Sequence, residues 1–373
     1  MLNEPEMTPK HPADGTGNTI TRHGRSVEDA GHRGAYQPLA PLYLRQGDTP
    51  RTFLWDILIA ALPLYLFAIY LYGFRVLTIA VISVVFCMLT EGLLAWFFRH
   101  CITLTDGTAC ITGVLLSLLL PPSVPLWMPA AGAVFAIAAV KEPFRGSGRN
   151  LLNPAFAGYA FLSLFWNARI SALPKPFVRL PVLAFRVDDS YLVQDQVLPA
   201  LKDGKLPDLQ LFQVFLGNKP GTVGAASALI LIAVFLYLLI RKTVRPTASL
   251  ACLAAAAAFC FLFPHLELAS DTIAIRFTAY QLCSGSLLLA AFFMECDPAS
   301  LPATFSGQAV FGLGCGILTM LLRYFGPDPD GAVWAVLVMN LLSPLLDRIF
   351  RLKHKRPKIS TGILPNKECG TQE

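Results

Sequence analysis

Residues 150–154 read Asn-Leu-Leu-Asn-Pro, and residues 340–344 read Asn-Leu-Leu-Ser-Pro. Upstream of them lies a second matched pair, Thr-Gly-Val-Leu-Leu at 112–116 and Ser-Gly-Ser-Leu-Leu at 284–288. The pairs keep the same order along the chain, so they indicate that its two halves are related. Repeated membrane units with short, Gly- or Pro-interrupted helices usually build a shared site near the bilayer midplane. We therefore expect two repeats around one site.

The composition is that of a membrane protein. Of 373 residues, 54% are hydrophobic and only 14% are charged. Inside a bilayer the backbone polar groups of a spanning segment must be satisfied internally, and helices achieve this. The chain is therefore predicted to be an all-α polytopic membrane protein in contact with the lipid bilayer. Its formal charge of +6 does not indicate nucleic-acid binding, because basic residues mainly lie between or beyond the apolar blocks, where they set topology.

About ten transmembrane helices are expected. The predicted spans are 53–72, 75–98, 109–120, 126–140, 152–166, 223–240, 247–263, 280–294, 307–322 and 331–347. Several are shorter than the roughly 20 residues that cross the hydrocarbon core, so short or broken helices are expected. The predicted organisation is a polar, disordered tail (1–50), a first five-helix repeat (51–166), a long loop (167–222), a second five-helix repeat (223–350) and a basic tail (351–373).

The basic residues predict the orientation of the chain. If the N-terminus is cytoplasmic, the connections that carry Arg99, Lys141 and Arg241 all fall inside, as does the basic stretch after Arg348. Cytoplasmic connections are enriched in Lys and Arg. We therefore expect a multi-pass protein of the bacterial inner (plasma) membrane, with both termini cytoplasmic and the loop 167–222 facing outward.

No motif for metal, hydrolytic or ATP-driven chemistry stands out. The nine cysteines are spread singly and form no CxxC pair, so neither a zinc nor an iron–sulfur site is expected. No Ser/His/Asp set, Walker loop or HExxH occurs, which argues against a stand-alone hydrolase or ATP-driven pump. The loop 167–222 exceeds the length of a simple connection, and loops of that length are usually functional or disordered.

Several sequence blocks appear in the order of one known family. They are residues 106–122 (Asp-Gly-Thr-Ala-Cys-Ile-Thr-Gly-Val-Leu-Leu-Ser-Leu-Leu-Leu-Pro-Pro), 146–155 (Gly-Ser-Gly-Arg-Asn-Leu-Leu-Asn-Pro-Ala), 284–285 (Ser-Gly), 297–298 (Asp-Pro) and 329–340 (Pro-Asp-Gly-Ala-Val-Trp-Ala-Val-Leu-Val-Met-Asn). Together they resemble the D subunit of the Rnf electron-transport complex over roughly residues 50–350. The B subunit of the sodium-translocating NADH:quinone oxidoreductase (Nqr) is similar but more distant.

The resemblance implies a fold, partners and a cofactor. It implies two inverted five-helix repeats, as in urea- and ammonium-channel-like proteins, and membership of a translocase that couples ferredoxin- or NADH-linked electron transfer to Na⁺ or H⁺ movement. The implied partners are the A and E membrane proteins of the complex, its G flavoprotein and its peripheral B and C proteins. The implied cofactor is FMN, esterified through its phosphate to a threonine of a Ser-Gly-Ala-Thr-like motif in the outward loop.

This chain departs from that motif. Counting back from residues 202–208, Lys-Asp-Gly-Lys-Leu-Pro-Asp, the acceptor threonine falls at Gln196, and no Ser-Gly-Ala-Thr occurs. A glutamine has no hydroxyl to esterify, so no covalent FMN is expected there. Ser190 and Thr222 are the next candidate acceptors, and non-covalent flavin in the helical core stays open.

Polar and glycine residues of the matched segments are the candidate site for non-covalent flavin or quinone. They are Thr112, Gly113, Asn150, Asn153, Ser284 and Asp297. Glycines permit close helix contact or present free N–H groups at a helix start. Asparagines cap helices or line a polar conduit, and both interpretations stay open.

Three further residues are candidates for ion coupling: Glu91, Asp106 and Asn340. A carboxylate inside a span is costly, so Glu91 by default suggests function, although a locally paired or snorkelling glutamate is the alternative. Asp106 precedes the first matched Thr-Gly segment and either caps a helix or faces a cofactor.

Two other functional classes compete with membership of the complex. One is a stand-alone transporter or channel for a small solute, built on the inverted repeat alone. The other is a scaffold that docks a soluble flavoprotein on the outward loop. The length of the loop 167–222 favours membership of the complex, because a simple channel has no evident need for it.

Overall fold

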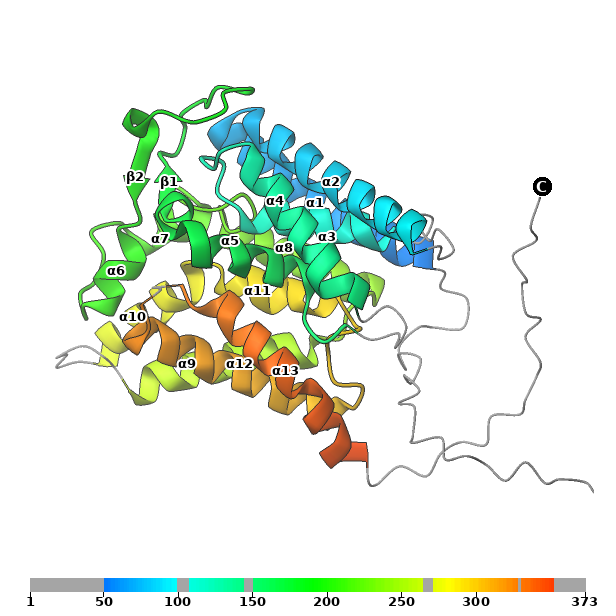
Figure 1. The fold of residues 1–373 in the computed structure, drawn as a ribbon. Coiled ribbons are helices and arrows are strands. Elements are labelled where there is room, and N and C mark those ends of the chain that lie inside the picture. Colours follow the sequence, from blue (N-terminus) through cyan, green and yellow to red (C-terminus); the bar gives the residue numbers. More distant parts are fainter. Residues whose placement is uncertain (1–49, 99–106, 144–149, 264–270, 328–329, 352–373) are drawn as a thin grey trace, which may run out of the picture. The chain divides into compact units, whose positions relative to one another are not determined.

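The computed structural model describes residues 50–98, 107–143, 150–263, 271–327 and 330–351. Each predicted span coincides with a helix or a pair of consecutive helices (Figure 1). These are α1 (Pro50–Tyr72), α2 (Arg75–Phe97), α3 (Thr108–Leu119), α4 (Trp127–Phe135) with its π-helical continuation η2 (Ala136–Lys141), α5 (Pro154–Ile170), α8 (Ala228–Arg241), α9 (Pro246–Leu262), α10 (Asp271–Cys283) with α11 (Leu287–Phe293), α12 (Phe305–Phe325) and α13 (Ala332–Arg351).

The helices confirm an all-α polytopic membrane protein. Within the described residues, four helices are long and apolar enough to cross a bilayer, and a bent pair forms either a fifth, broken span or a re-entrant loop. Four shorter apolar helices lie among them, α3, α4 with η2, α8 and α9. Large apolar side chains such as Leu66, Leu93 and Trp96 are exposed on α1 and α2, and such faces are stable only where lipid or another protein covers them.

The helices run between two ends of the bundle. The loop end, as we call it, is where α1 ends, α2 begins and residues 171–227 lie. The terminal end is where α1 begins and α13 ends (Figure 1). Helices from both halves of the chain contribute to one continuous hydrophobic core.

The segment predicted as a single span at 280–294 is bent in the structure. The segment predicted at 280–294 is two helices: α10 begins at Asp271, and it meets α11 at an angle of 58° across residues 284–286. The break is possible because Gly285 has φ +64°, a conformation that glycine adopts without a Cβ clash. The first part of α10 escaped prediction because Asp271, Thr272 and Arg276 interrupt its apolar pattern.

The matched sequence stretches have different backbone roles. Asn153 is the N-cap of α5, whereas Asn340 lies inside α13 and Pro344 is accommodated within that helix. Likewise Gly113 lies inside α3, whereas Gly285 forms the break between α10 and α11. The similarity of the two halves therefore does not place these particular residues in equivalent positions.

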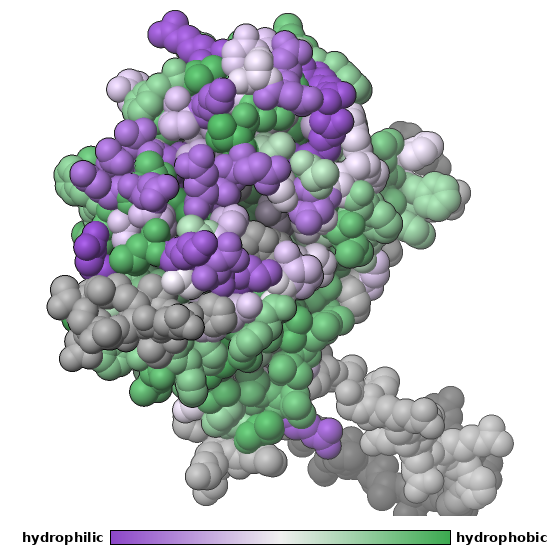
Figure 2. Space-filling view, turned by 90° about the vertical axis from the view of Figure 1, so that its left-hand side faces the viewer, coloured by the Kyte–Doolittle hydropathy of each residue, from purple (hydrophilic) through white to green (hydrophobic). Residues whose placement is uncertain are grey.

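The segment after α5 is ordered. Strands β1 (Ala172–Pro174) and β2 (Leu192–Gln194) pair antiparallel, and they are followed by α6 (Val197–Lys202) and α7 (Leu211–Leu216). The chain then returns in extended form: Val223 N donates to Leu120 O (3.1 Å) and Gly224 N to Leu118 O (2.7 Å). These bonds delay the start of α8 to residue 228, past the predicted boundary at 223. Figure 2 shows hydrophilic residues gathered on this face of the molecule.

Candidate functional site

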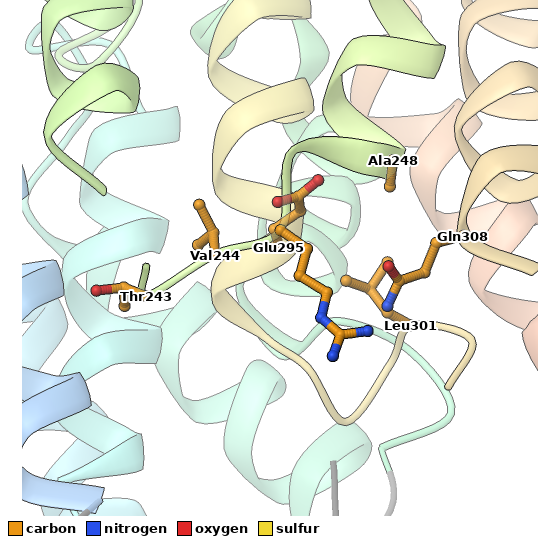
Figure 3. A pocket seen from close by; sticks show the side chains of 7 residues that line it. Thr243, Val244, Ala248, Glu295, Leu301 and Gln308 are labelled. Atoms are coloured by element: carbon orange, nitrogen blue, oxygen red, sulfur yellow. The ribbon is translucent and has the colours of Figure 1, made fainter. Parts of the chain in front are cut away.

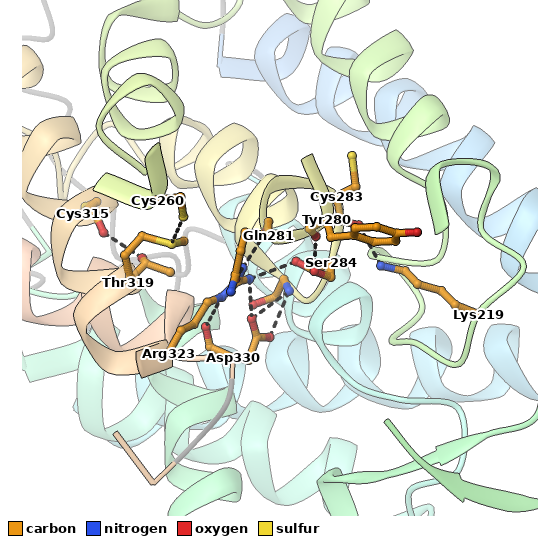
Figure 4. Close-up of polar contacts among 12 residues, drawn as sticks. Lys219, Cys260, Tyr280, Gln281, Cys283, Ser284, Cys315, Thr319, Arg323 and Asp330 are labelled. Atoms are coloured by element: carbon orange, nitrogen blue, oxygen red, sulfur yellow. Dashed lines mark hydrogen bonds and ion pairs between the residues drawn. The ribbon is translucent and has the colours of Figure 1, made fainter. Parts of the chain in front are cut away.

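A buried arginine lies at the break between α10 and α11. The Arg323 side chain projects from α12 and is 2% exposed. Its Nη1 donates to Gln281 Oε1 (3.0 Å) and its Nη2 to Ser284 O (2.9 Å), as Figure 4 shows. The last carbonyls of a helix have no partner within the helix and carry a partial negative charge. Arg323 therefore stabilises the end of α10 with its positive charge.

Asp330 completes the break on the side of α11. Its two carboxylate oxygens accept hydrogen bonds from Ser286 N at 2.9 and 3.0 Å. Arg323 also donates Nε to the Asp330 carbonyl at 3.1 Å, and the ionised groups lie 3.4 Å apart. A carboxylate is favourable where a helix begins and a cation where a helix ends. The two charges therefore stabilise opposite sides of the same break.

Residues 171–227 contribute a second cation to the break. Lys219 is 3% exposed, and its Nζ donates to Cys283 O at 2.7 Å (Figure 4). Burial lowers the pKa of the Lys219 ammonium, while the nearby Asp195 carboxylate opposes that shift. Burial also raises the pKa of Asp195, whose Oδ1 accepts from Val197 N at 2.9 Å. These contacts attach the segment to the helix break.

A buried ion pair lies at the terminal end. Lys141 Nζ donates to Glu91 Oε1 at 2.8 Å and to Thr108 Oγ1 at 2.7 Å. The Glu91 side chain is 4% exposed and that of Lys141 is 15% exposed. The pair connects α2 with the end of the η2 π-helical turn and with the start of α3. Glu91 is therefore a locally paired carboxylate. From the sequence, Lys141 was used only to predict the orientation of the chain in the membrane, not as a partner of Glu91.

Two residues of the predicted cofactor site meet at the same end. Asn150 Nδ2 lies 3.4 Å from Asp297 Oδ2, and 147 residues separate them in sequence. Burial raises the pKa of Asp297 to about 6, and the Asn150 hydrogen bond acts in the opposite direction. This pairing brings residues of the two halves together, and a carboxyl group with a pKa near neutrality can exchange protons.

A small pocket lies between α9, the end of α11 and α12. It is lined by Thr243, Val244, Arg245, Ala248, Glu295, Leu301 and Gln308 (Figure 3). Glu295 Oε1 accepts from Ser249 N and Ser249 Oγ, both at 2.8 Å. Glu295 Oε2 and Gln308 Oε1 are buried without a hydrogen-bond partner among the residues described. Two oxygen acceptors without a hydrogen-bond partner among the described residues therefore lie beside this pocket.

The Asn340 side chain is buried inside α13 and has no hydrogen bond to the residues that the structure describes. It is 1% exposed, and neither Oδ1 nor Nδ2 has a partner in the described part of the chain. Ser343 and Asp347 follow at spacings of three and seven residues and are also buried, so the three share one helix face. Asp347 Oδ1 accepts from Ala303 N at 2.8 Å. A polar stripe thus runs along α13 from the terminal end to Asn340.

The other predicted site residues have structural contacts. Thr112 Oγ1 donates to Thr108 O within α3 at 3.1 Å. A Cβ on Gly113 would lie 2.6 Å from Val84 Cα, so this glycine permits close approach of α3 to α2. Asn153 Oδ1 accepts from Ala155 N at 3.1 Å as the N-cap of α5. Ser284 donates Oγ to Tyr280 O, and Asp106 lies outside the described residues.

Gln196, the residue predicted to stand at the flavin-acceptor position, does not fit an ester-linked FMN. Gln196 directly precedes α6, its side chain is exposed, and its carboxamide cannot form a phosphoester. Of the alternative acceptors, Ser190 is exposed in a short 3₁₀ helix (Asp189–Tyr191), and Thr222 Oγ1 accepts from Ala225 N at 3.3 Å. No group of three or more His, Cys, Asp or Glu residues suited to a metal ion occurs in the part of the chain that the structure describes.

Several charged residues of these sites were not selected from the sequence. Arg323 lies just beyond the predicted span 307–322, and Lys219 lies near the end of the predicted loop. A charge at the edge of an apolar segment is a usable signal, because intramembrane ionisable residues usually have a partner or a function. Glu295 lies just beyond the predicted span 280–294, and Asp330 lies just before the predicted span 331–347.

The fold defines a polytopic helical membrane protein with charge pairs at both ends of its bundle, and comparison with known proteins narrows the class. Residues 40–356 match the model of the NQR2, RnfD, RnfE family, which covers most of the chain. The chain therefore belongs to this family.

Proteins of known name show the same relationship. The chain is 33% identical over 310 residues to the D subunit of the Na(+)-translocating ferredoxin:NAD(+) oxidoreductase complex of Acetobacterium woodii, covering 82% of this chain and 91% of the relative. It is 29% identical over 315 residues to the D subunit of the proton-translocating ferredoxin:NAD(+) oxidoreductase complex of Clostridium ljungdahlii, covering 82% and 92%. It is 28% identical over 342 residues to the D subunit of the ion-translocating oxidoreductase complex of Halorhodospira halophila, covering 85% and 95%.

Proposed function

We propose that this chain is the D-type membrane component of an Rnf-type complex that couples ferredoxin- or NADH-linked electron transfer to the translocation of Na⁺ or H⁺. The observation that carries the proposal is the 33% identity over 310 residues to the D-type relative from Acetobacterium woodii. The match spans both halves of the helical bundle and the segment 171–227. The relatives are named as parts of complexes, which favours membership of a complex over a stand-alone transporter or channel.

The partners and the orientation belong to the same proposal. The partners are the A and E membrane proteins of the complex, its G flavoprotein and its peripheral B and C proteins. The protein lies in the bacterial inner membrane with its terminal end in the cytoplasm. The basic residues Lys141, Arg241 and Arg348 lie at or near that end, in agreement with the positive-inside rule.

The ion route is proposed along the polar groups of the terminal end. Glu295 and Gln308, beside the pocket, each carry a buried oxygen with no hydrogen-bond partner in the part of the chain that the structure describes, and the stripe of α13 continues to Asn340. Buried polar groups without partners are rare in proteins and call for an explanation such as a transient ligand. The pair Glu91–Lys141 is a second candidate for coupling, because a charge pair at a bilayer surface can rearrange when a neighbouring ion arrives.

We propose that the chain takes part in the redox reaction of the complex but carries no ester-linked flavin at Gln196. The segment 171–227 then positions partner proteins rather than an ester-bound FMN. A non-covalent flavin or quinone near Asn150 and Asp297 stays within the proposal, since those two side chains meet and bring a proton donor close to a carboxamide.

The test is purification of the chain from its own host with an affinity tag and mild detergent. We expect the other Rnf-type proteins to copurify, and inverted membrane vesicles to build an ion gradient when reduced ferredoxin and NAD⁺ are added. Deletion of the chain should abolish the gradient. Recovery of the chain alone, with ferredoxin:NAD⁺ activity unchanged by its deletion, would overturn the proposal in favour of a stand-alone transporter.

A further inference from the structure

The connection between β1 and β2 exposes a run of large apolar side chains. Phe177, Val182, Leu183 and Phe185 are 55%, 41%, 78% and 68% exposed. Exposed apolar groups this close in sequence mark a surface that something other than water covers. The connection belongs to the long segment at the loop end, and the helix-break contacts described above do not involve it.

A buried arginine at the start of α2 binds this connection next to the turn between α1 and α2. Arg75, the first residue of α2, is 0% exposed. Its Nη1 donates to Pro181 O (2.9 Å) and Ala184 O (2.8 Å). Its Nε and Nη2 donate to Pro122 O (2.8 Å) and Val124 O (2.9 Å) in the α3–α4 connection. Leu183 therefore lies between two residues that are bound to the end of a membrane span.

A second attachment joins the connection to α1. Leu180 N donates to Tyr72 O at 3.0 Å. The Phe177 ring meets the Tyr70 ring edge-on, with 5.8 Å between centroids and an interplanar angle of 85°. Tyr70 lies in the last turn of α1 and is 70% exposed, on the apolar face that also presents Leu66. The exposed surface of the connection thus continues the face of α1 that lies in the membrane.

Cationic side chains flank the apolar run. Lys175, Arg179 and Arg186 are exposed, and Arg186 pairs with Asp189 at 3.4 Å. Aromatic rings are enriched where membrane spans end. Apolar side chains beside Lys and Arg are typical of segments that insert into the headgroup region, because the long cationic chains reach the lipid phosphates.

We propose that residues 175–186 form a lipid-binding anchor at the bilayer interface of the loop end. Phe177, Leu183 and Phe185 insert at the boundary between headgroups and acyl chains, and Lys175 and Arg179 contact lipid phosphates. The occupant is the lipid leaflet, because the segment lies beside the end of α1 (Figure 1), and its ring contact with Tyr70 and its hydrogen bond to Tyr72 place the apolar run next to the exposed face of α1. This inference rests on membrane insertion alone and is independent of the redox function.

The experiment measures the depth of a tryptophan placed on the connection. The full chain carrying Leu183→Trp or Phe185→Trp is reconstituted in nanodiscs of phosphatidylcholine and phosphatidylglycerol, with or without brominated acyl chains. The matched control is Ser190→Trp, an exposed position in the same connection. The unsubstituted chain provides the signal of the five native tryptophans, and unchanged thermal unfolding shows that each variant is folded.

The expected result is selective quenching by lipid. Brominated chains should reduce the added emission at 183 and 185 about two-fold or more, whereas aqueous iodide should have little effect, as for groups buried in the interface. The Ser190→Trp control should respond to iodide alone. Iodide quenching at 183 and 185 equal to the control would overturn the anchor. Loss of lipid quenching at both positions in the purified complex would assign the surface to a partner protein and would also overturn it.

Discussion

Arg323 donates its Nη2 hydrogen to the carbonyl of Ser284 at 2.9 Å, at the point where α10 has ended and α11 has not begun. The same guanidinium lies 3.4 Å from Asp330, which binds the N–H of Ser286. One ion pair thus stabilises both sides of a helix break. The break is held by side chains from other segments, so its stability depends on them.

Replacement of Arg323 tests this dependence. Arg323→Met keeps the apolar stem but leaves the carbonyl of Ser284 without a donor and Asp330 without its cation. Loss of one partner from a buried charged network costs about 3 kcal/mol. We expect a large fall in the midpoint of unfolding in detergent, measured by size-exclusion chromatography after heating.

The control for this prediction is Arg186→Met, because Arg186 is exposed and pairs with the exposed Asp189. Exposed pairs contribute only about 0–1 kcal/mol, so this variant should unfold close to the unsubstituted chain. Equal effects of the two substitutions would contradict the role assigned to Arg323.

The pair Glu91–Lys141 is suited to a double-mutant cycle. Glu91→Gln leaves a largely buried ammonium without its counter-charge, and Lys141→Met leaves a buried carboxylate. Each single change should destabilise the protein by about 2–4 kcal/mol, and the double change by clearly less than the sum. Additive losses would show that the two groups do not stabilise each other. Ion transport by the assembled complex, measured on variants that still assemble, separates a coupling role from a structural one.

The pH dependence of stability near Asp297 follows from its raised pKa. The folded value is about 6, above the usual 3.8, so the folded state holds one more proton between these limits. Stability therefore falls as pH rises from about 4 to 6, because the unfolded state binds fewer protons. Asp297→Asn should flatten this part of the curve of unfolding midpoint against pH. An unchanged slope in the variant would assign the pH dependence to another group.

The helices and their order could be predicted from the sequence because apolar blocks carry the signal directly. Even the short helix α3 was found, as the predicted span 109–120, since Pro121 and Pro122 mark its end. The break at Ser284 was not found, because it requires side chains from α12 and from residues 171–227. Arg323 is visible in the sequence as a charge at the edge of an apolar segment, but its long-range partners at the break leave no local pattern.

In the candidate site, too, single residues could be selected from the sequence, whereas most of their partners could not. Asn150 and Asp297 were both selected from the sequence, and the structure brings them together. Glu91 was selected as an intramembrane carboxylate, but its partner Lys141 was seen only as a topology signal. Glu295 was overlooked because it follows an apolar run and looks like a loop residue, although the fold places it against the start of α9.

The residue at the predicted flavin-acceptor position leads to a prediction that can be tested on the purified full-length protein. Gln196 cannot form a phosphoester, so the purified, denatured chain should show no flavin fluorescence in a gel and an intact mass without FMN. A mass increase equal to FMN would contradict the assignment of this position. Ser190→Ala and Thr222→Ala would then identify the acceptor, because only loss of the true hydroxyl removes the added mass.

Substitutions of Asn340 can distinguish a contribution to protein stability from a contribution to ion transport. Its carboxamide is buried in α13 with neither atom hydrogen-bonded in the described part of the chain, and an unpaired buried polar group costs about 1–3 kcal/mol. Asn340→Leu removes that cost at similar volume, so we expect a higher unfolding midpoint than for the unsubstituted chain. If Asn340 lines the ion route, the same variant should translocate ions at least about ten-fold more slowly in reconstituted complexes, since an apolar side chain offers no ligand to an ion. Asn340→Asp, which keeps an oxygen ligand, should retain more transport than the leucine variant. A leucine variant that is less stable and transports at the normal rate would show that Asn340 has a structural partner and no part in the ion route.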